Sequence, residues 1–142
     1  MKRGAGAARA NELHLSLPIP PSVNHCYRRF TDKSGRRMNV TTKKARDWID
    51  GAVDAAREEM RRTGWVPPQG EKVVLEYTPY WPDRRRRDPS NLEKIMLDAL
   101  CAKTKERPGI VMDDDQFVLP RCMDFGYDKA EPRVEIVIRR RG

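Results

Sequence analysis

The chain has 142 residues, a length that predicts one domain with a core of its own. Lys and Arg outnumber Asp and Glu by 29 to 21, for a net charge of +8. No apolar run approaches the about 20 residues that span a bilayer, and residues 1–10 lack the apolar stretch of a signal peptide, so we expect a cytoplasmic protein with no membrane association. Three widely separated cysteines without a Cys-x-x-Cys pair argue against a disulfide scaffold and against a structural zinc site.

The first third of the chain predicts a tail, a strand and a loop. Residues 1–10 have no periodicity and are expected to be flexible, which leaves residues 11–142 as a single domain. Leucines alternate with polar residues over 11–17, which predicts a half-buried strand that ends at the following prolines. The next segment is predicted to be a loop with a turn or hairpin tip near 32–35.

The middle of the chain predicts a helix and a second strand. Over residues 42–62 the apolar side chains recur at spacings of three and four, as in an amphipathic helix. Thr41 or Thr42 is suited to cap its start, and Gly64 to end it. Residues 72–81 are rich in β-branched and aromatic side chains and predict a strand.

A second helix is predicted to begin at Asp88 as its N-cap, with Pro89 in the first helical position. Its buried stripe comprises Leu92, Ile95, Met96, Ala99 and Leu100. Beyond it we expect a short strand at 110–112, another within 116–125 and a last strand at 133–139. This order predicts an α+β fold: a single domain with a mixed sheet of four to five strands and two helices packed on one face.

The charges are unevenly distributed along the chain. Residues 21–47 hold eight Lys or Arg against two Asp, and residues 84–87 are four consecutive arginines. Residues 88–115, in contrast, hold seven acids against four bases. Basic surface attracts a polyanion, and an acidic centre inside basic surroundings suits a metal-dependent nuclease.

The second helix places polar side chains beside its buried stripe. Asn91, Lys94 and Asp98 fall within about 60° of one another around the helix axis. If Asp88 and Asp114 converge, they offer the oxygen ligands that Mg²⁺ prefers, and Lys94 is placed to neutralise phosphate charge. From the residues alone, other interpretations stay open: Asp88 as a helix cap, residues 113–115 as a solvated turn, and Lys94 as the ion-pair partner of Asp98.

Several short motifs occur together in one order along the chain. They are Pro20-Pro21-Ser22-Val23-Asn24 with Tyr27, then Arg84-Arg85-Arg86-Arg87-Asp88-Pro89-Ser90-Asn91-Leu92-Glu93-Lys94, then Asp98-Ala99-Leu100 and Asp113-Asp114-Asp115-Gln116. The combination resembles the RusA family of Holliday-junction resolvases over about residues 13 to 138.

This resemblance implies a homodimeric endonuclease that depends on Mg²⁺, with Mn²⁺ as a substitute, and that needs no small-molecule cofactor. Such enzymes place symmetric nicks in four-way junction DNA and serve DNA recombination and repair, and the chain would suit a phage or prophage origin. The family's acidic residues map onto Asp88 and Asp114, its lysine onto Lys94 and its asparagine onto Asn91.

Ser90 departs from the family pattern, which commonly has a second Asp at this position. The expected metal ligands are therefore Asp88 and Asp114, with Asp113 and the weaker Ser90 hydroxyl in support. The expected DNA-binding residues comprise Arg84, Arg85, Arg86, Arg87, Asn91, Asn24, Tyr27, Arg28, Arg29, Lys43 and Lys44. Tyr27 and Phe30 are also candidates for base stacking, whereas Trp48 lies on the core stripe of the first helix.

The sequence is compatible with three functions. The first is a structure-selective endonuclease, for which Asp88 and Asp114 are essential to cleavage. The second is a junction-binding protein whose catalysis is weakened or lost because of Ser90. The third, a basic RNA-associated module, accounts least well for the ordered acidic motifs.

Overall fold

The computed structural model describes residues 10–101 and 117–141. In this part of the chain, β1 (Glu12–Leu17), β7 (Arg133–Arg140), β4 (Val73–Trp81) and β5 (Val118–Cys122) lie side by side in that order. β6 (Gly126–Tyr127) pairs with the end of β4. β7 is antiparallel to both neighbours, whereas β5 and β6 are parallel to β4, so the sheet is mixed as predicted.

The sheet forms because three segments alternate apolar and polar side chains with a period of two. β1, β4 and β7 each bury every second side chain. The antiparallel register joins these rows, with Leu15 opposite Ile136 and Leu75 opposite Ile138, all buried. The core therefore lies on one face of the sheet.

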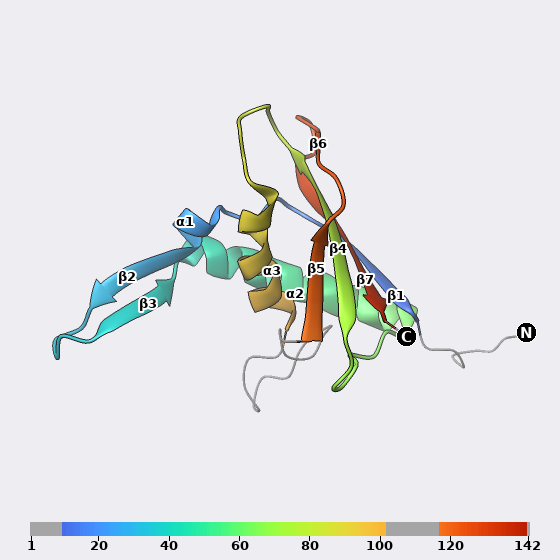
Figure 1. Ribbon diagram of the computed structural model, residues 1–142, viewed down its shortest axis with the longest axis horizontal. Coiled ribbons are helices and arrows are strands. Elements are labelled where there is room, and N and C mark those ends of the chain that lie inside the picture. The colour runs from blue at the N-terminus through green and yellow to red at the C-terminus, as the bar shows by residue number, and fades with distance from the viewer. Residues whose placement is uncertain (1–9, 102–116, 142) are drawn as a thin grey trace, which may run out of the picture.

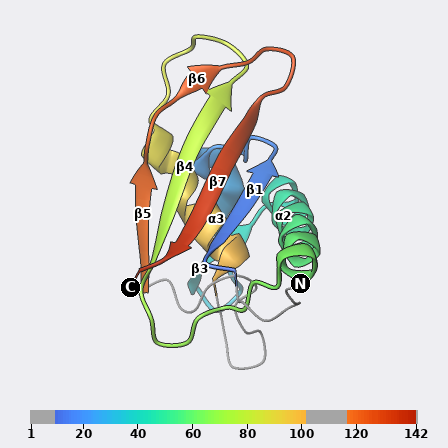
Figure 2. The same ribbon diagram turned by 90° about the vertical axis from the view of Figure 1, so that its right-hand side faces the viewer.

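Two helices complete this core. α3 (Glu93–Leu100) buries Met96 and Leu100 in the same apolar cluster as β4 and β7. α2 (Lys43–Thr63) packs against α3 and β1 and adds Ala52 and Ala56 to that cluster. Figure 2 shows both helices next to the sheet, α3 behind its strands and α2 beside β1. The α+β fold with a mixed sheet and two helices is confirmed.

A separate hairpin projects from this body. β2 (Tyr27–Thr31) and β3 (Arg37–Thr41) pair only with each other and point away from the sheet (Figure 1). α1 (Val23–Cys26), a single turn, precedes the hairpin. Asp32 closes its tip, because the carboxylate accepts from the backbone N–H groups of Ser34 and Arg36 at 2.9 Å, and Gly35 supplies a positive φ of 86°. The tip lies where it was predicted, but its arms are strands rather than loop.

α2 begins and ends at the predicted caps. The Thr42 hydroxyl oxygen accepts from the backbone N–H of Ala45 at 3.3 Å, and the Thr42 hydroxyl donates to the His25 carbonyl at 2.7 Å. Gly64 ends the helix with φ 78° and donates its N–H to the Met60 carbonyl. Thr42 therefore caps α2 and also ties it to α1.

Replacing Thr42 with Ala is expected to lower the free energy of unfolding by about 1 kcal/mol, because one capping bond and one link to α1 are lost. The measurement is the urea midpoint at unchanged m-value. Thr42→Ser keeps both hydrogen bonds and is expected to stay close to wild type. Equal losses in the two variants would show that the hydroxyl contributes nothing.

The second predicted helix differs in the structure. The helix that begins at Asp88 is divided into a 3₁₀ turn, η1 (Pro89–Leu92), and α3. The strand predicted within 116–125 is confirmed as β5. Residues 123–125 then leave the ladder, and β6, beyond the predicted range, pairs with β4 from Gly126. The strand predicted at 110–112 and the predicted tail, apart from residue 10, lie outside the described residues. No helix in the described ranges is both long and apolar enough to cross a membrane.

Candidate active site

The loop between β4 and η1 carries the arginine run and is held in a defined shape. Asp83 accepts from the backbone N–H of Arg85 at 3.0 Å and forms an ion pair with Arg87 at 2.8 Å. These contacts hold the pKa of the Asp83 carboxyl below its usual range, the backbone bond from Arg85 contributing most. The Arg87 guanidinium also lies 5.0 Å from the centre of the Trp81 ring. Arg87 is therefore fixed against the end of β4.

Asp88 ends this loop as the N-cap of η1, as predicted. Its Oδ1 accepts from the backbone N–H of Ser90 at 3.0 Å and from the Ser90 hydroxyl at 2.8 Å. Its Oδ2 has no hydrogen-bond partner among the described residues, and the side chain is exposed. Asp88 thus caps η1 with one oxygen and leaves the other without a hydrogen-bond partner among the described residues.

A cleft of about 340 Å³ brings the two separate sequence motifs together. One wall is the loop from Arg85 to Asp88 with Asn91 in η1, and the other is residues 19, 20 and 22 of the segment after β1. Ser22 thus faces the same cleft as Asp88, although 66 positions separate them in the chain. The fold therefore gathers positive charge, an amide and a carboxylate around one cavity.

Lys94 belongs to a second polar cluster, where the hairpin meets α3. Its Nζ lies 3.6 Å from Oδ2 of Asp98 and 4.6 Å from the centre of the Tyr27 ring. The Tyr27 hydroxyl donates to the same Asp98 oxygen. Burial, reinforced by this hydrogen bond and by the Asp98 charge, raises the pKa of Tyr27, so the phenol stays a donor at neutral pH. The predicted Lys94–Asp98 ion pair is present, and Tyr27 joins it.

The other predicted DNA-binding residues lie around the hairpin. Arg28 and Arg29 are exposed on β2, and Lys43 and Lys44 are exposed in the first turn of α2. Lys43 pairs with Asp47 at 2.8 Å. Asn24 lies in α1, directly before the hairpin. The DNA-binding roles of these residues stay predictions.

The acidic neighbourhood of Asp88 includes residues that the sequence analysis did not assign. The Tyr77 hydroxyl on β4 donates to Glu93, the first residue of α3, and burial together with that bond raises the pKa of Tyr77. Burial also raises the pKa of the Cys122 thiol, with the charges of Glu93, Asp124 and Asp88 adding to it. The end of β5 therefore lies within electrostatic reach of Asp88.

The described residues include only part of the predicted metal site. Among residues 10–101 and 117–141, no group of three or more His, Cys, Asp or Glu side chains is placed to hold a metal ion. Asp113 and Asp114, two of the predicted ligands, lie outside these ranges. The predicted ligand set of Asp88, Ser90, Asp113 and Asp114 therefore stays a prediction that rests on the sequence.

Comparisons with known proteins agree with the motif pattern. Residues 18–139 match the family described as endodeoxyribonuclease RusA. The chain is 30% identical over 132 residues to the crossover junction endodeoxyribonucleases RusA of Enterobacteria phage 82, Escherichia coli strain K12 and Shigella sonnei. Each alignment covers 93% of this chain and 98% of the relative. The chain therefore belongs to the RusA family of endodeoxyribonucleases.

Proposed function

We propose that this protein cleaves four-way DNA junctions, the activity that the names of its relatives describe for them. The observation that carries the proposal is the cleft in which three arginines and Asn91 surround Asp88. Phosphates of the DNA backbone bind the guanidinium groups, and the exposed Oδ2 of Asp88 faces the phosphate to be cleaved. The surrounding positive charge also makes binding steeply dependent on salt.

The residues around Asp88 fit a hard divalent cation. Asp88 offers a carboxylate oxygen outside its capping bonds, and Ser90 adds a neutral hydroxyl from the same turn. We propose that Asp88 and Asp114 hold Mg²⁺ or Mn²⁺, with support from Asp113 and Ser90. When bound, the ion supplies Lewis-acid polarisation of the phosphate and a water of lowered pKa. Lys94 neutralises charge that develops on the phosphate or the leaving oxygen.

Paired cleavage follows if the protein is a homodimer. A four-way junction presents near-twofold symmetry, and an isologous dimer places two equal sites on two strands. We propose that one dimer makes two symmetric nicks, with the basic hairpin and the first turn of α2 contacting the DNA arms. The predicted contacts of this surface are Arg28, Arg29, Lys43 and Lys44.

The test incubates the wild-type protein with an immobile synthetic four-way junction and with a linear duplex of matched sequence. Each substrate is assayed with Mg²⁺, with Mn²⁺ and with EDTA. We expect paired nicks at symmetric positions in the junction alone, and no nicks in EDTA. Cleavage of both substrates at equal rates would contradict selectivity for structure.

A second function is favoured by one observation at the proposed metal site. Where the family commonly has a carboxylate, the Ser90 hydroxyl donates to Asp88, so one negative charge is missing beside the proposed ion. If this second function holds, the protein binds junctions tightly but cuts them neither with Mg²⁺ nor with Mn²⁺. In that case Ser90→Asp is expected to produce cleavage, and Ser90→Ala is expected to stay inactive.

A further inference from the structure

Exposed apolar side chains are concentrated at one end of the sheet. The structure describes five large apolar residues as exposed, and three of them lie within residues 123–127: Met123 at 57%, Phe125 at 53% and Tyr127 at 40%. Exposed apolar side chains that adjoin one another are typical of interaction sites, whereas singly scattered ones are ordinary. No function for this segment is predicted from the sequence.

The two rings form an ordered pair with a cation. Phe125 and Tyr127 lie edge to face, with ring centres 6.1 Å apart and an interplanar angle of 89°. The Arg84 guanidinium lies 4.4 Å from the centre of the Tyr127 ring. We call Arg84, Phe125 and Tyr127 the aromatic edge. Arg84 forms no ion pair within the described residues, so its charge remains available to an anion.

The backbone beneath the aromatic edge is held firmly. Gly126 pairs with Tyr80, and a Cβ at Gly126 would lie 3.0 Å from the Tyr80 ring, so only glycine fits this approach without a shift. Asp128 donates its N–H to the Trp81 carbonyl at 2.8 Å. Tyr127 is thus held on β6, and Phe125 directly precedes this strand.

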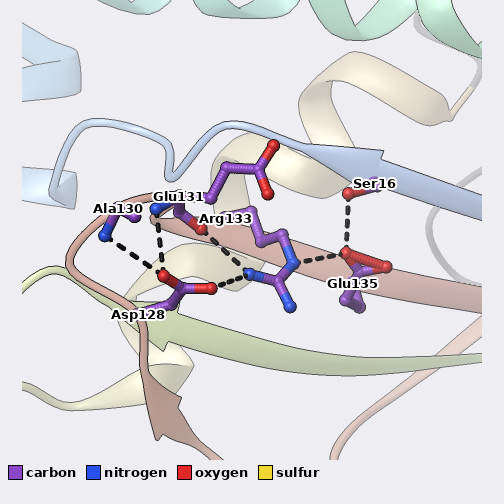
Figure 3. A network of polar contacts seen from close by, with 6 residues as sticks. All are labelled: Ser16, Asp128, Ala130, Glu131, Arg133 and Glu135. Atoms are coloured by element: carbon purple, nitrogen blue, oxygen red, sulfur yellow. Dashed lines mark hydrogen bonds and ion pairs between the residues drawn. The ribbon is translucent and has the colours of Figure 1, made fainter.

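An ion-pair network closes the turn that follows β6. Figure 3 shows Arg133 between Asp128 and Glu135. The Arg133 guanidinium forms ion pairs with these two carboxylates, at 2.8 and 2.9 Å. Asp128 also accepts from the backbone N–H of Ala130, and Glu135 accepts from Ser16 on β1. The ion pair with Arg133 compensates the charge of Asp128. The network therefore holds in place the chain that directly follows Tyr127.

The aromatic edge borders the candidate active site. β6 and the loop that follows β4 lie at the same end of the sheet (Figure 1). Tyr127 is the partner of Trp81, and Trp81 lines the cleft that contains Asp88. The charge of Asp88 reaches Cys122, one residue before Met123, and adds to the rise in the pKa of that thiol. A nucleic acid bound over Asp88 would therefore pass the two rings.

We propose that Phe125 and Tyr127 stack unpaired bases at the branch point of the DNA, while Arg84 binds the adjoining phosphate. Exposed aromatic faces stack any base, and a neighbouring arginine supplies the charge that a nucleic acid requires. The run from Arg84 to Arg87 makes this end of the molecule complementary to a polyanion rather than to an apolar protein surface. The inference rests on the proposed function and names the structural feature of DNA that the site recognises.

The test measures binding without cleavage, in EDTA, to a junction with 2-aminopurine at the branch and to the same junction with 2-aminopurine inside an arm. The double variant Phe125→Ala/Tyr127→Ala is expected to bind the junction about tenfold or more weakly, with affinity for linear duplex changed less than twofold. The wild type is expected to quench the branch probe relative to the arm probe, and the variant to lose this quenching. Circular dichroism melting checks that the variant is folded.

Matched controls separate stacking from other effects. Val66→Ala removes an equally exposed apolar side chain, at 45%, from a segment outside the aromatic edge, and is expected to bind like wild type. Phe125→Leu/Tyr127→Leu keeps apolar area without aromatic rings and is expected to bind as weakly as the alanine variant. Arg84→Gln provides an independent variant that leaves the rings in place, and it is expected to weaken junction binding.

Three results would overturn the inference in distinguishable ways. If the wild type cleaves junctions and the alanine and leucine double variants bind junctions as tightly as the wild type does, the stacking role fails and the proposed function stands. If the wild type neither binds nor cleaves branched DNA, the proposed function fails and the stacking role with it. If the alanine variant changes the mass measured by light scattering, the aromatic edge is a contact between copies of the chain instead.

Discussion

Asp88→Asn is expected to reduce junction cleavage by roughly a thousandfold or more, because it removes a charged ligand from the proposed metal site. The fold should persist, since Asn is as good an N-cap as Asp and its side-chain oxygen can still accept from Ser90. Binding should persist as well, because the neighbouring arginines are unchanged. The measurement combines single-turnover cleavage rates with junction affinity in EDTA.

Asp54→Asn is the matched control for this prediction. Asp54 is exposed on α2, has no ion-pair partner among the described residues, and loses the same charge on substitution. It is expected to leave the cleavage rate within twofold of wild type. If Asp88→Asn cleaves at the wild-type rate, Asp88 serves only as a helix cap and the proposed site is wrong.

The elements that the sequence predicted well are those specified by local chemistry. α2 combines a long 3.6-residue periodicity with a capping Thr42 and a terminal Gly64, and its observed bounds differ from the predicted ones by one residue. β1 and β7 alternate apolar and polar residues and face one another in register. Neither kind of signal depends on distant parts of the chain.

The hairpin arms were missed because they lack this local signal. The apolar residues of Tyr27–Thr31 and Arg37–Thr41 do not alternate regularly with polar ones, and β2 buries none of its side chains. Their strands form by pairing with each other, and the Asp32 turn sets the register. The two-residue strand β6 is too short to show a periodicity of its own, so the sequence does not predict it.

The site was predictable to the extent that its residues share one helix or one motif. Helical spacing alone pairs Lys94 with Asp98, and an Asp before Pro alone predicts the cap at Asp88. The third member of the Lys94 cluster, Tyr27, comes from a strand 67 positions away and required the fold. The pairing of Phe125 with Tyr127 also required the fold, because Phe125 lies outside β6 and the two-residue spacing on a strand does not apply to it.

Lys94→Met is expected to reduce the cleavage rate about a hundredfold, the usual loss when one charge-stabilising group is removed from a phosphate site. The loss of stability should be small, about 1 kcal/mol or less, because the Lys94–Asp98 ion pair is partly exposed. Asp98 also keeps its hydrogen bond from Tyr27, so the substitution leaves no buried charge without a partner. The measurement is the cleavage rate at saturating junction, together with the urea midpoint.

A purely structural role for Lys94 makes a different set of predictions. If Lys94 only helps to anchor the hairpin to α3, Tyr27→Phe and Asp98→Asn should lower cleavage as much as Lys94→Met, since both remove that anchor. The loss would then appear in junction affinity, because the basic hairpin would no longer be held in place, rather than in the rate at saturation. Lys94→Arg separates the two roles further, since it keeps the charge and is expected to retain more activity than Lys94→Met. A fall in rate at unchanged affinity, confined to the Lys94 variants, would identify the ammonium group as acting on the phosphate itself.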